Sequence, residues 1–89
     1  MNPGYERGVD RVKKRFYLTY PPELIKEPLI YQAGKLYKVV TNIRQSSISN
    51  KLGLVALELE GEPAEIDKAV RFFCDKGIKV EPIELDVIE

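Results

Sequence analysis

Hydrophobic and polar residues alternate over residues 15–20, where the sequence reads Arg-Phe-Tyr-Leu-Thr-Tyr. Phe16, Leu18 and Tyr20 fall on one side at a period of two, and aromatic residues favour strands. Two prolines follow, and a proline has no N–H to donate to a sheet. The pattern therefore predicts a first strand that ends at Tyr20.

Two segments repeat their apolar residues at the spacing of an amphipathic helix. The first opens at Pro28, which suits a first helical position, and its apolar stripe contains Leu29, Ile30, Ala33, Leu36 and Tyr37. The second follows Pro63 and ends before Gly77, a residue that favours the left-handed conformation after a helix. Its buried stripe is expected to contain Ile66, Ala69, Val70 and Phe73.

Three further segments alternate as strands, at residues 39–48, 54–60 and 78–81. The polar, turn-like residues 47–51 separate the first two segments, which predicts a hairpin. Val55, Leu57 and Leu59 share one side of the middle segment. Pro82 follows the last segment and predicts that this strand lies at an edge of the sheet.

The order strand, helix, strand, strand, helix, strand predicts an α+β fold, the ferredoxin-like βαββαβ sandwich. In this fold two right-handed β-α-β crossovers share a four-stranded antiparallel sheet of order 4-1-3-2, and both helices cover one face. We expect one such domain over residues 14–89. A flexible lead-in is expected over residues 1–13, which contain Pro3, Gly4 and Gly8 and show no clean periodicity.

The predicted strand order also places charges beside one another. The basic run Lys13-Lys14-Arg15 begins the first strand, which lies antiparallel to the fourth. The acidic residues that end the chain are Glu84, Asp86 and Glu89. Opposite charges on neighbouring strands contribute about 0.2–1 kcal/mol each. We therefore expect the basic run to pair with the fourth strand rather than to bind nucleic acid.

The composition removes several classes of protein. The 89 residues include no His and a single Cys, so neither an intrachain disulfide nor a multi-cysteine metal site can form. No nucleophile–base pair can be assembled from the remaining side chains. We predict no catalytic residues, no metal site and no enzyme activity. Cys74 is expected to be a partly buried structural residue of the second helix.

Charge and hydropathy exclude further partners. Fourteen basic and fourteen acidic residues cancel, and the predicted third strand lacks the aromatic residues on which RNA-recognition modules stack bases. No nucleic-acid partner is therefore expected. The chain has no run of about 18 apolar residues and no signal peptide, which predicts no membrane span and a cytoplasmic location.

The sheet face turned away from the helices, here called the open face, is expected to carry apolar as well as polar side chains. By alternation it presents Tyr17, Thr19, Val40, Asn42, Arg44, Leu54, Ala56 and Glu58. Exposed apolar area of this kind is often covered by a second copy of the chain or by a partner domain. Scattered surface apolar residues are also common, and the residues alone leave both interpretations open.

Asn42 stands out because asparagine is a poor strand former. Its carboxamide carries donors and an acceptor, so one side chain can meet both the ammonium and the carboxylate of an amino acid. From spacing alone, a solvated asparagine on an exposed face is the preferred interpretation.

Six short segments spread over residues 14–82 resemble the NIL domain in their order and spacing. They are Phe-Tyr-Leu-Thr-Tyr-Pro at 16–21, Glu-Pro-Leu-Ile at 27–30, Thr-Asn-Ile at 41–43, Leu-Gly at 52–53, Leu-Glu-Leu-Glu-Gly at 57–61 and Gly-Ile-Lys-Val-Glu at 77–81. The resemblance implies a ferredoxin-like fold related to the amino-acid-sensing ACT domains. The NIL family includes the C-terminal domain of methionine-import ABC ATPases, which pairs with its twin and senses methionine.

The resemblance assigns a role to particular residues. An Asn-Ile pair of the NIL family matches Asn42 and Ile43. The family's asparagine is implicated in holding methionine at the domain interface. Arg44 stands where the family often has an aliphatic residue. We therefore expect a non-catalytic domain that binds methionine or a related sulfur amino acid at Asn42 and Ile43, with Tyr20 and Leu54 as apolar walls. The expected partner is a second copy or a docked domain.

An alternative function is suggested by a second group of proteins that contain NIL domains. Some NIL domains lie at the N-terminus of ferredoxins linked to sulfur and homocysteine metabolism. The chain would then be an interaction module that binds no free ligand, and an iron–sulfur cluster would belong to a downstream module rather than to this chain. No Walker motif precedes the domain, so we expect either a free-standing NIL protein or a piece cut before such a module.

Overall fold

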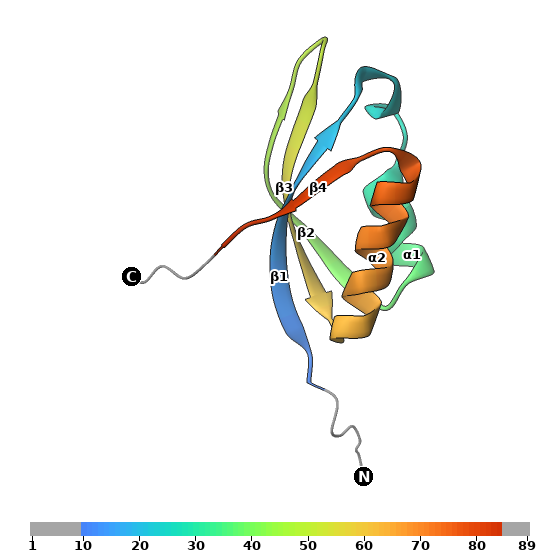
Figure 1. The fold of residues 1–89 in the computed structure, drawn as a ribbon, viewed down its shortest axis with the longest axis vertical. Coiled ribbons are helices and arrows are strands. Elements are labelled where there is room, and N and C mark those ends of the chain that lie inside the picture. Colours follow the sequence, from blue (N-terminus) through green and yellow to red (C-terminus); the bar gives the residue numbers. More distant parts are fainter. Residues whose placement is uncertain (1–9, 85–89) are drawn as a thin grey trace.

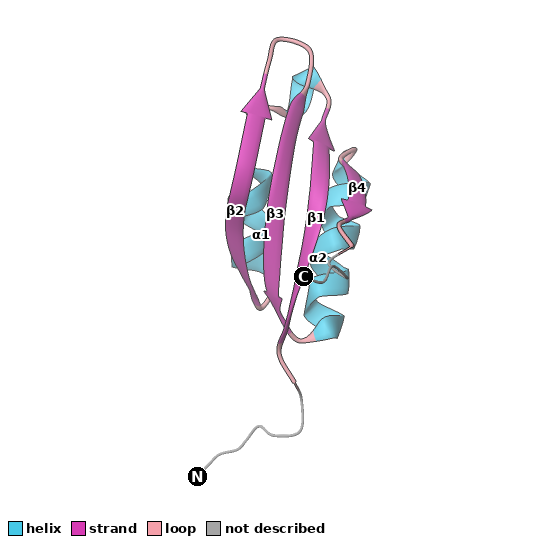
Figure 2. Ribbon diagram, turned by 90° about the vertical axis from the view of Figure 1, so that its left-hand side faces the viewer, coloured by secondary structure: helices cyan, strands magenta, loops and turns pink. Residues whose placement is uncertain are grey.

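The sheet has the predicted strand order. The structure is a computed structural model, and it describes residues 10–84. Four antiparallel strands lie in the order β2-β3-β1-β4, which is the order 4-1-3-2 read from the other edge (Figure 2). Their bounds are β1 Val12–Tyr20, β2 Val39–Ile48, β3 Gly53–Gly61 and β4 Lys79–Pro82.

Both helices lie on the same face of this sheet, as predicted (Figure 1). A short 3-10 helix, Pro22–Leu24, leads toward α1 (Leu29–Leu36), and α2 spans Pro63–Lys76. Pro28 lies at the cap position before α1 rather than inside its first turn. Gly77 ends α2 with φ 103°, the left-handed conformation predicted for it. The α+β ferredoxin-like sandwich is therefore confirmed.

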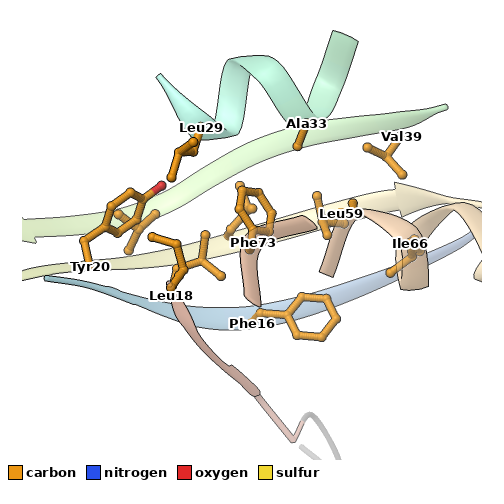
Figure 3. Close-up of a cluster of buried hydrophobic side chains, with 13 residues drawn as sticks. Phe16, Leu18, Tyr20, Leu29, Ala33, Val39, Leu59, Ile66 and Phe73 are labelled. Carbon is orange, nitrogen blue, oxygen red and sulfur yellow. The ribbon is translucent and has the colours of Figure 1, made fainter. Parts of the chain in front are cut away.

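The core lies between the sheet and the two helices (Figure 3). The strand residues predicted to point inward are buried: Phe16, Leu18, Tyr20, Val55, Leu57 and Leu59. They meet Ala33 of α1 and Ile66, Ala69 and Phe73 of α2, all fully buried. Alternation in the strands and helical spacing in α2 thus produce one continuous core.

Three buried positions were predicted wrongly. Leu36 is 61% exposed although its spacing places it on the same side of α1 as Leu29, because it is the last residue of the helix. Val70 is only partly buried at the margin of the core. Cys74 is exposed, because its neighbour Phe73 takes the buried position on α2.

The start of β2 is fixed against β3 and α2. A Cβ added to Gly61 would lie 2.7 Å from the carbonyl oxygen of Lys38, so only glycine permits this close approach. The backbone N–H of Lys38 donates to Glu65 Oε1 at 2.9 Å. This hydrogen bond, with a second from Lys68, lowers the pKa of Glu65. α2 therefore orients the chain as it enters β2.

The hairpin between β2 and β3 has a short turn. β2 ends at Ile48, as predicted, and the backbone N–H of Ser49 donates to the carbonyl oxygen of Leu52 at 2.9 Å, which closes the turn. The pairing also contains a bulge between Ile43 and Gln45, since Ile43 pairs with Leu57 and Gln45 with Ala56. Arg44 is the extra residue, which simple alternation did not reveal.

Of the predicted charge pairing between the first and fourth strands, the structure describes only the part that concerns Glu84. β4 pairs with residues 16–19 of β1, and after it the backbone N–H of Ile83 donates to the carbonyl oxygen of Arg15 at 2.9 Å. Lys13 and Arg15 face Glu60 and Glu58 on β3. No ion pair within residues 10–84 joins the basic run to Glu84, while Asp86 and Glu89 lie outside the described residues.

The expected domain limits fall partly outside the described residues. Of the lead-in expected over 1–13, residues 1–9 are not described, and β1 begins at Val12. Residues 85–89 of the expected domain are likewise not described. No helix in the described part of the chain is long and apolar enough to cross a membrane.

Candidate ligand-binding site

An apolar cavity of about 250 Å³ lies between α1 and strands β2 and β3. Its apolar lining comes from the β1–α1 connection, from α1 and from the sheet: Tyr20, Ile25, Pro28, Leu29, Ile30, Tyr31, Ile43, Ile48 and Val55. Tyr31, Ile43 and Ile48 are each more than half exposed, so the cavity opens to solvent along β2. The volume lies just below the usual range of about 300–1,000 Å³ for ligand pockets, which suits a small ligand.

Tyr20 and Gly53 form the inner part of the cavity. Tyr20 is 6% exposed, and its ring is directed toward Leu29 of α1 (Figure 3). Burial raises the pKa of the Tyr20 phenol, so this wall stays uncharged at neutral pH. Gly53 is the register partner of Tyr20, and a Cβ there would lie 3.3 Å from the Tyr20 Cβ. Glycine at this position therefore helps to keep the space open.

The four residues predicted to form the site lie in two groups on opposite faces of the sheet. Tyr20 and Ile43 line the apolar cavity on the helix side. Asn42 pairs with Glu58 on the open face, and Leu54 lines a separate hollow there with Tyr17 and Ala56. Asn42 and Ile43 are consecutive in an extended strand, so their side chains point to opposite faces.

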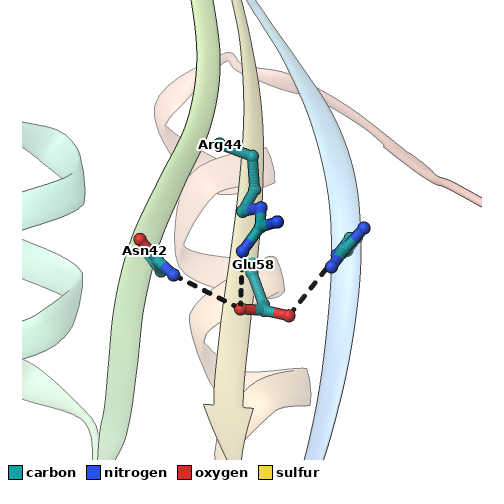
Figure 4. A network of polar contacts seen from close by, with 4 residues as sticks. Asn42, Arg44 and Glu58 are labelled. Atoms are coloured by element: carbon teal, nitrogen blue, oxygen red, sulfur yellow. Dashed lines mark hydrogen bonds and ion pairs between the residues drawn. The ribbon is translucent and has the colours of Figure 1, made fainter.

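Asn42 belongs to a polar cluster around Glu58 (Figure 4). Its Nδ2 donates to Glu58 Oε1 at 3.4 Å, and Arg15 Nε donates to Glu58 Oε2 at the same distance. Arg44 contributes a guanidinium nitrogen 3.8 Å from Oε1. Burial acts to raise the pKa of Glu58, but the hydrogen bonds from Arg15 and Asn42 and the two positive charges outweigh it and lower the pKa.

Comparison with known proteins identifies the family to which this chain belongs. A model of the NIL domain matches residues 14–82. The chain belongs to the NIL domain family. A curated relative is the methionine import ATP-binding protein MetN of Bacillus subtilis (strain 168), which is 31% identical over 74 residues, 79% of this chain. The match covers 22% of that protein's length.

A solved structure has the same architecture as this NIL domain. It is the C-terminal domain of an ABC transporter ATP-binding protein from Enterococcus faecalis. The TM-score is 0.71 at 25% sequence identity, and the match covers 81% of this chain and 84% of that one. The resemblance seen in the sequence is thus confirmed for the family and for the fold.

Sequence reasoning missed most of the cavity of this NIL domain. Ile25, Leu29 and Ile48 come from three separate segments, and only the packing of α1 on β2 brings them together. Glu58 was expected on the open face, but not as the partner of Asn42. That pairing depends on the hairpin register, which requires the turn geometry. Residues 10–84 contain no cluster of three or more metal-ligating side chains.

The polar cluster around Glu58 predicts that the stability of the domain depends on pH. A Glu58→Gln variant should lose this contribution to the pH dependence. The folded-state pKa of Glu58 lies below its ordinary value of 4.5, so its ionised form stabilises the fold above that pH. The stabilisation is lost as the pH falls through the folded pKa. We expect Glu58→Gln to be less stable than the parent at pH 7 and the difference to shrink at about pH 3. Urea unfolding at both pH values measures the difference in free energy of unfolding between the parent and the variant. An equal difference at both pH values would contradict the prediction.

Proposed function

We propose that this NIL domain is a non-catalytic regulatory domain that binds L-methionine or a related sulfur amino acid. The observation that carries the proposal is the apolar cavity that opens along β2 and is lined by Ile43, the residue that follows Asn42 in this edge strand. An unbranched thioether side chain suits an irregular apolar space. The curated relative is named for methionine import, which supports the same ligand class.

In the proposed complex the ligand lies along the outer side of β2. Its side chain enters the cavity past Ile43, against the buried ring of Tyr20. Its ammonium and carboxylate remain outside, where the backbone groups of an edge strand and the carboxamide of Asn42 can bind them. The adjacency of Asn42 and Ile43 along an edge strand allows one ligand to contact both.

The proposal also includes a second domain. Within the described residues β2 pairs only with β3, so its outer edge is available for a second copy or a partner domain. Such a partner would close the ligand site from outside, and ligand binding would stabilise the pair. Leu54 can contribute to this site only from the open-face side, as part of the surface that meets the partner.

Calorimetric titration of the chain with L-methionine tests the proposal, and L-leucine is the control because it has similar size without the thioether. We expect saturable binding of methionine and markedly weaker binding of leucine. Bound methionine should also raise the thermal midpoint with concentration. Absence of binding, or equal binding of both amino acids, would contradict the proposal and favour the ligand-free interaction module.

An Asn42→Ala variant is expected to lose at least about tenfold in methionine affinity, the effect of losing hydrogen bonds to a charged ligand. Stability should fall by less than about 1 kcal/mol, because Asn42 is exposed and its one side-chain hydrogen bond among the described residues is long. Asn50→Ala, in the exposed β2–β3 turn, is the matched control. An unchanged affinity in Asn42→Ala would remove this residue from the proposed site.

A further inference from the structure

A second hollow lies on the open face, on the other side of the sheet from the apolar cavity. Its volume is about 370 Å³, and it is lined by Arg15, Tyr17, Arg44, Gln45, Ala56 and Ile83. Both arginines point toward the same hollow from different strands, β1 and β2. Neither the family match nor the named relatives assign a ligand to this place.

The β-bulge in β2 makes this hollow. Asn42 faces Glu58 and Gln45 faces Ala56, so the strand carries one extra residue between these two open-face positions. That residue is Arg44, whose guanidinium reaches across the open face to Glu58 (Figure 4). Consecutive residues Arg44 and Gln45 therefore line the same hollow, which strict alternation would forbid. Bulges commonly re-aim side chains at functional sites.

Among residues 10–84, the charges at this hollow do not cancel. Two guanidinium groups share the single carboxylate of Glu58, and Glu58 itself does not line the hollow. Arg15 uses only its Nε in the hydrogen bond to Glu58, and the Arg44 contact of 3.8 Å is longer than a hydrogen bond. The remaining guanidinium N–H groups can thus bind an anion, for which the fork geometry suits a carboxylate.

A second hollow of similar volume adjoins the charged one. The two share Tyr17, Gln45 and Ala56, and the second hollow adds Leu54 with two serines of β2, so its apolar part is Tyr17, Ala56 and Leu54. Tyr17 and Leu54 are about two-fifths exposed. An anionic head between the arginines would therefore leave room for a short hydrocarbon chain over Tyr17, Ala56 and Leu54.

We propose that the open face of this domain binds a small aliphatic carboxylate. The carboxylate lies between Arg15 and Arg44, and the hydrocarbon part covers Ala56 toward Leu54. The site is separate from the methionine cavity, because the two lie on opposite faces of the sheet. It requires no ammonium group on the ligand, since both charged side chains that line the hollow are cationic.

Chemical-shift titration with hexanoate tests the site, with hexylammonium as the probe of opposite charge. We expect saturable shifts of the amides of Tyr17, Gln45 and Ala56 with hexanoate and none with hexylammonium. Arg44→Gln and Arg15→Gln should each weaken hexanoate binding at least about tenfold. Arg71→Gln, which removes an exposed arginine from the helix side, should leave binding unchanged.

Three results would overturn the proposal: no saturable shift, equal shifts with hexylammonium, or undiminished hexanoate binding by Arg44→Gln. The side chain of Arg44 is 45% exposed and that of Arg15 is 34% exposed, so Arg44→Gln is expected to fold even if Arg15→Gln does not. Ile43 lines the methionine cavity but not the arginine hollow. An Ile43→Asp variant should therefore still bind hexanoate, so the hexanoate result does not depend on whether the domain binds methionine.

Discussion

An Ile43→Asp variant is expected to lose methionine binding almost completely while the domain stays folded. Ile43 lines the apolar cavity, and the carboxylate would place an unpaired charge against the thioether side chain of the ligand. We expect at least about a hundredfold loss of affinity, which corresponds to about 2.7 kcal/mol. Ile43 is 54% exposed in the ligand-free domain, so the same charge remains hydrated there and unfolds nothing. Calorimetry measures the affinity, and circular dichroism checks the fold.

Val40→Asp is the matched control for this substitution. Val40 lies on the same strand with the same 54% exposure, but it does not line the cavity. The control should keep methionine binding within about twofold, since a distant surface change costs within about 0.5 kcal/mol. Equal losses in both variants would mean that charge on β2, rather than the cavity, controls binding.

A Phe73→Ala variant is expected to destabilise the domain by about 3–5 kcal/mol, the usual effect of deleting a buried phenylalanine. Phe73 is fully buried on α2, where it packs against the sheet and edge-on to Phe72. Small domains have a total stability of about 5–15 kcal/mol, so the variant should be close to unfolding. Urea denaturation followed by circular dichroism measures the change.

Phe72→Ala provides the comparison on the same helix. Phe72 is only partly buried, and it contacts Tyr37 at a ring-centroid distance of 5.9 Å. We expect a clearly smaller loss for Phe72→Ala than for Phe73→Ala. A larger loss for Phe72→Ala would show that the two faces of α2 are assigned the wrong way round.

The fold could be predicted because the apolar patterns of the strands and helices are compatible with very few arrangements of the sheet. Alternation gives β1 one buried face, which contains Phe16, Leu18 and Tyr20. Helical spacing gives α2 one buried face, which contains Ile66, Ala69 and Phe73. Few arrangements bury all of these faces, since crossover handedness restricts the order of the strands. Charge was a weaker guide, because Lys13 and Arg15 face acidic residues of β3 that the charge argument did not consider.

The site could be predicted only in part because it depends on register and on packing between distant segments. Asn42 and Ile43 were identified, but their alternation places them on opposite faces, and only the edge position of β2 lets one ligand reach both. The bulge at Arg44 inserts one residue without any glycine or proline in the sequence to mark it. Cavity residues such as Ile25 and Ile48 carry no chemical signal of their own.

The chain spans about a fifth of the length of its methionine-import relative, so the proposed regulation concerns one domain. In this account the two faces of the sheet have separate roles. The helix side holds the apolar cavity, and the open face carries the arginine hollow and the cluster around Glu58.

The central claim is that the cavity beside β2 binds methionine, and an amide chemical-shift titration with L-methionine tests it most directly. The account predicts saturable shifts at Ile25, Leu29, Ile43 and Gly53, which line the cavity, and much weaker shifts with L-leucine. Absence of shifts, or shifts confined to the exposed side of α2, would contradict it.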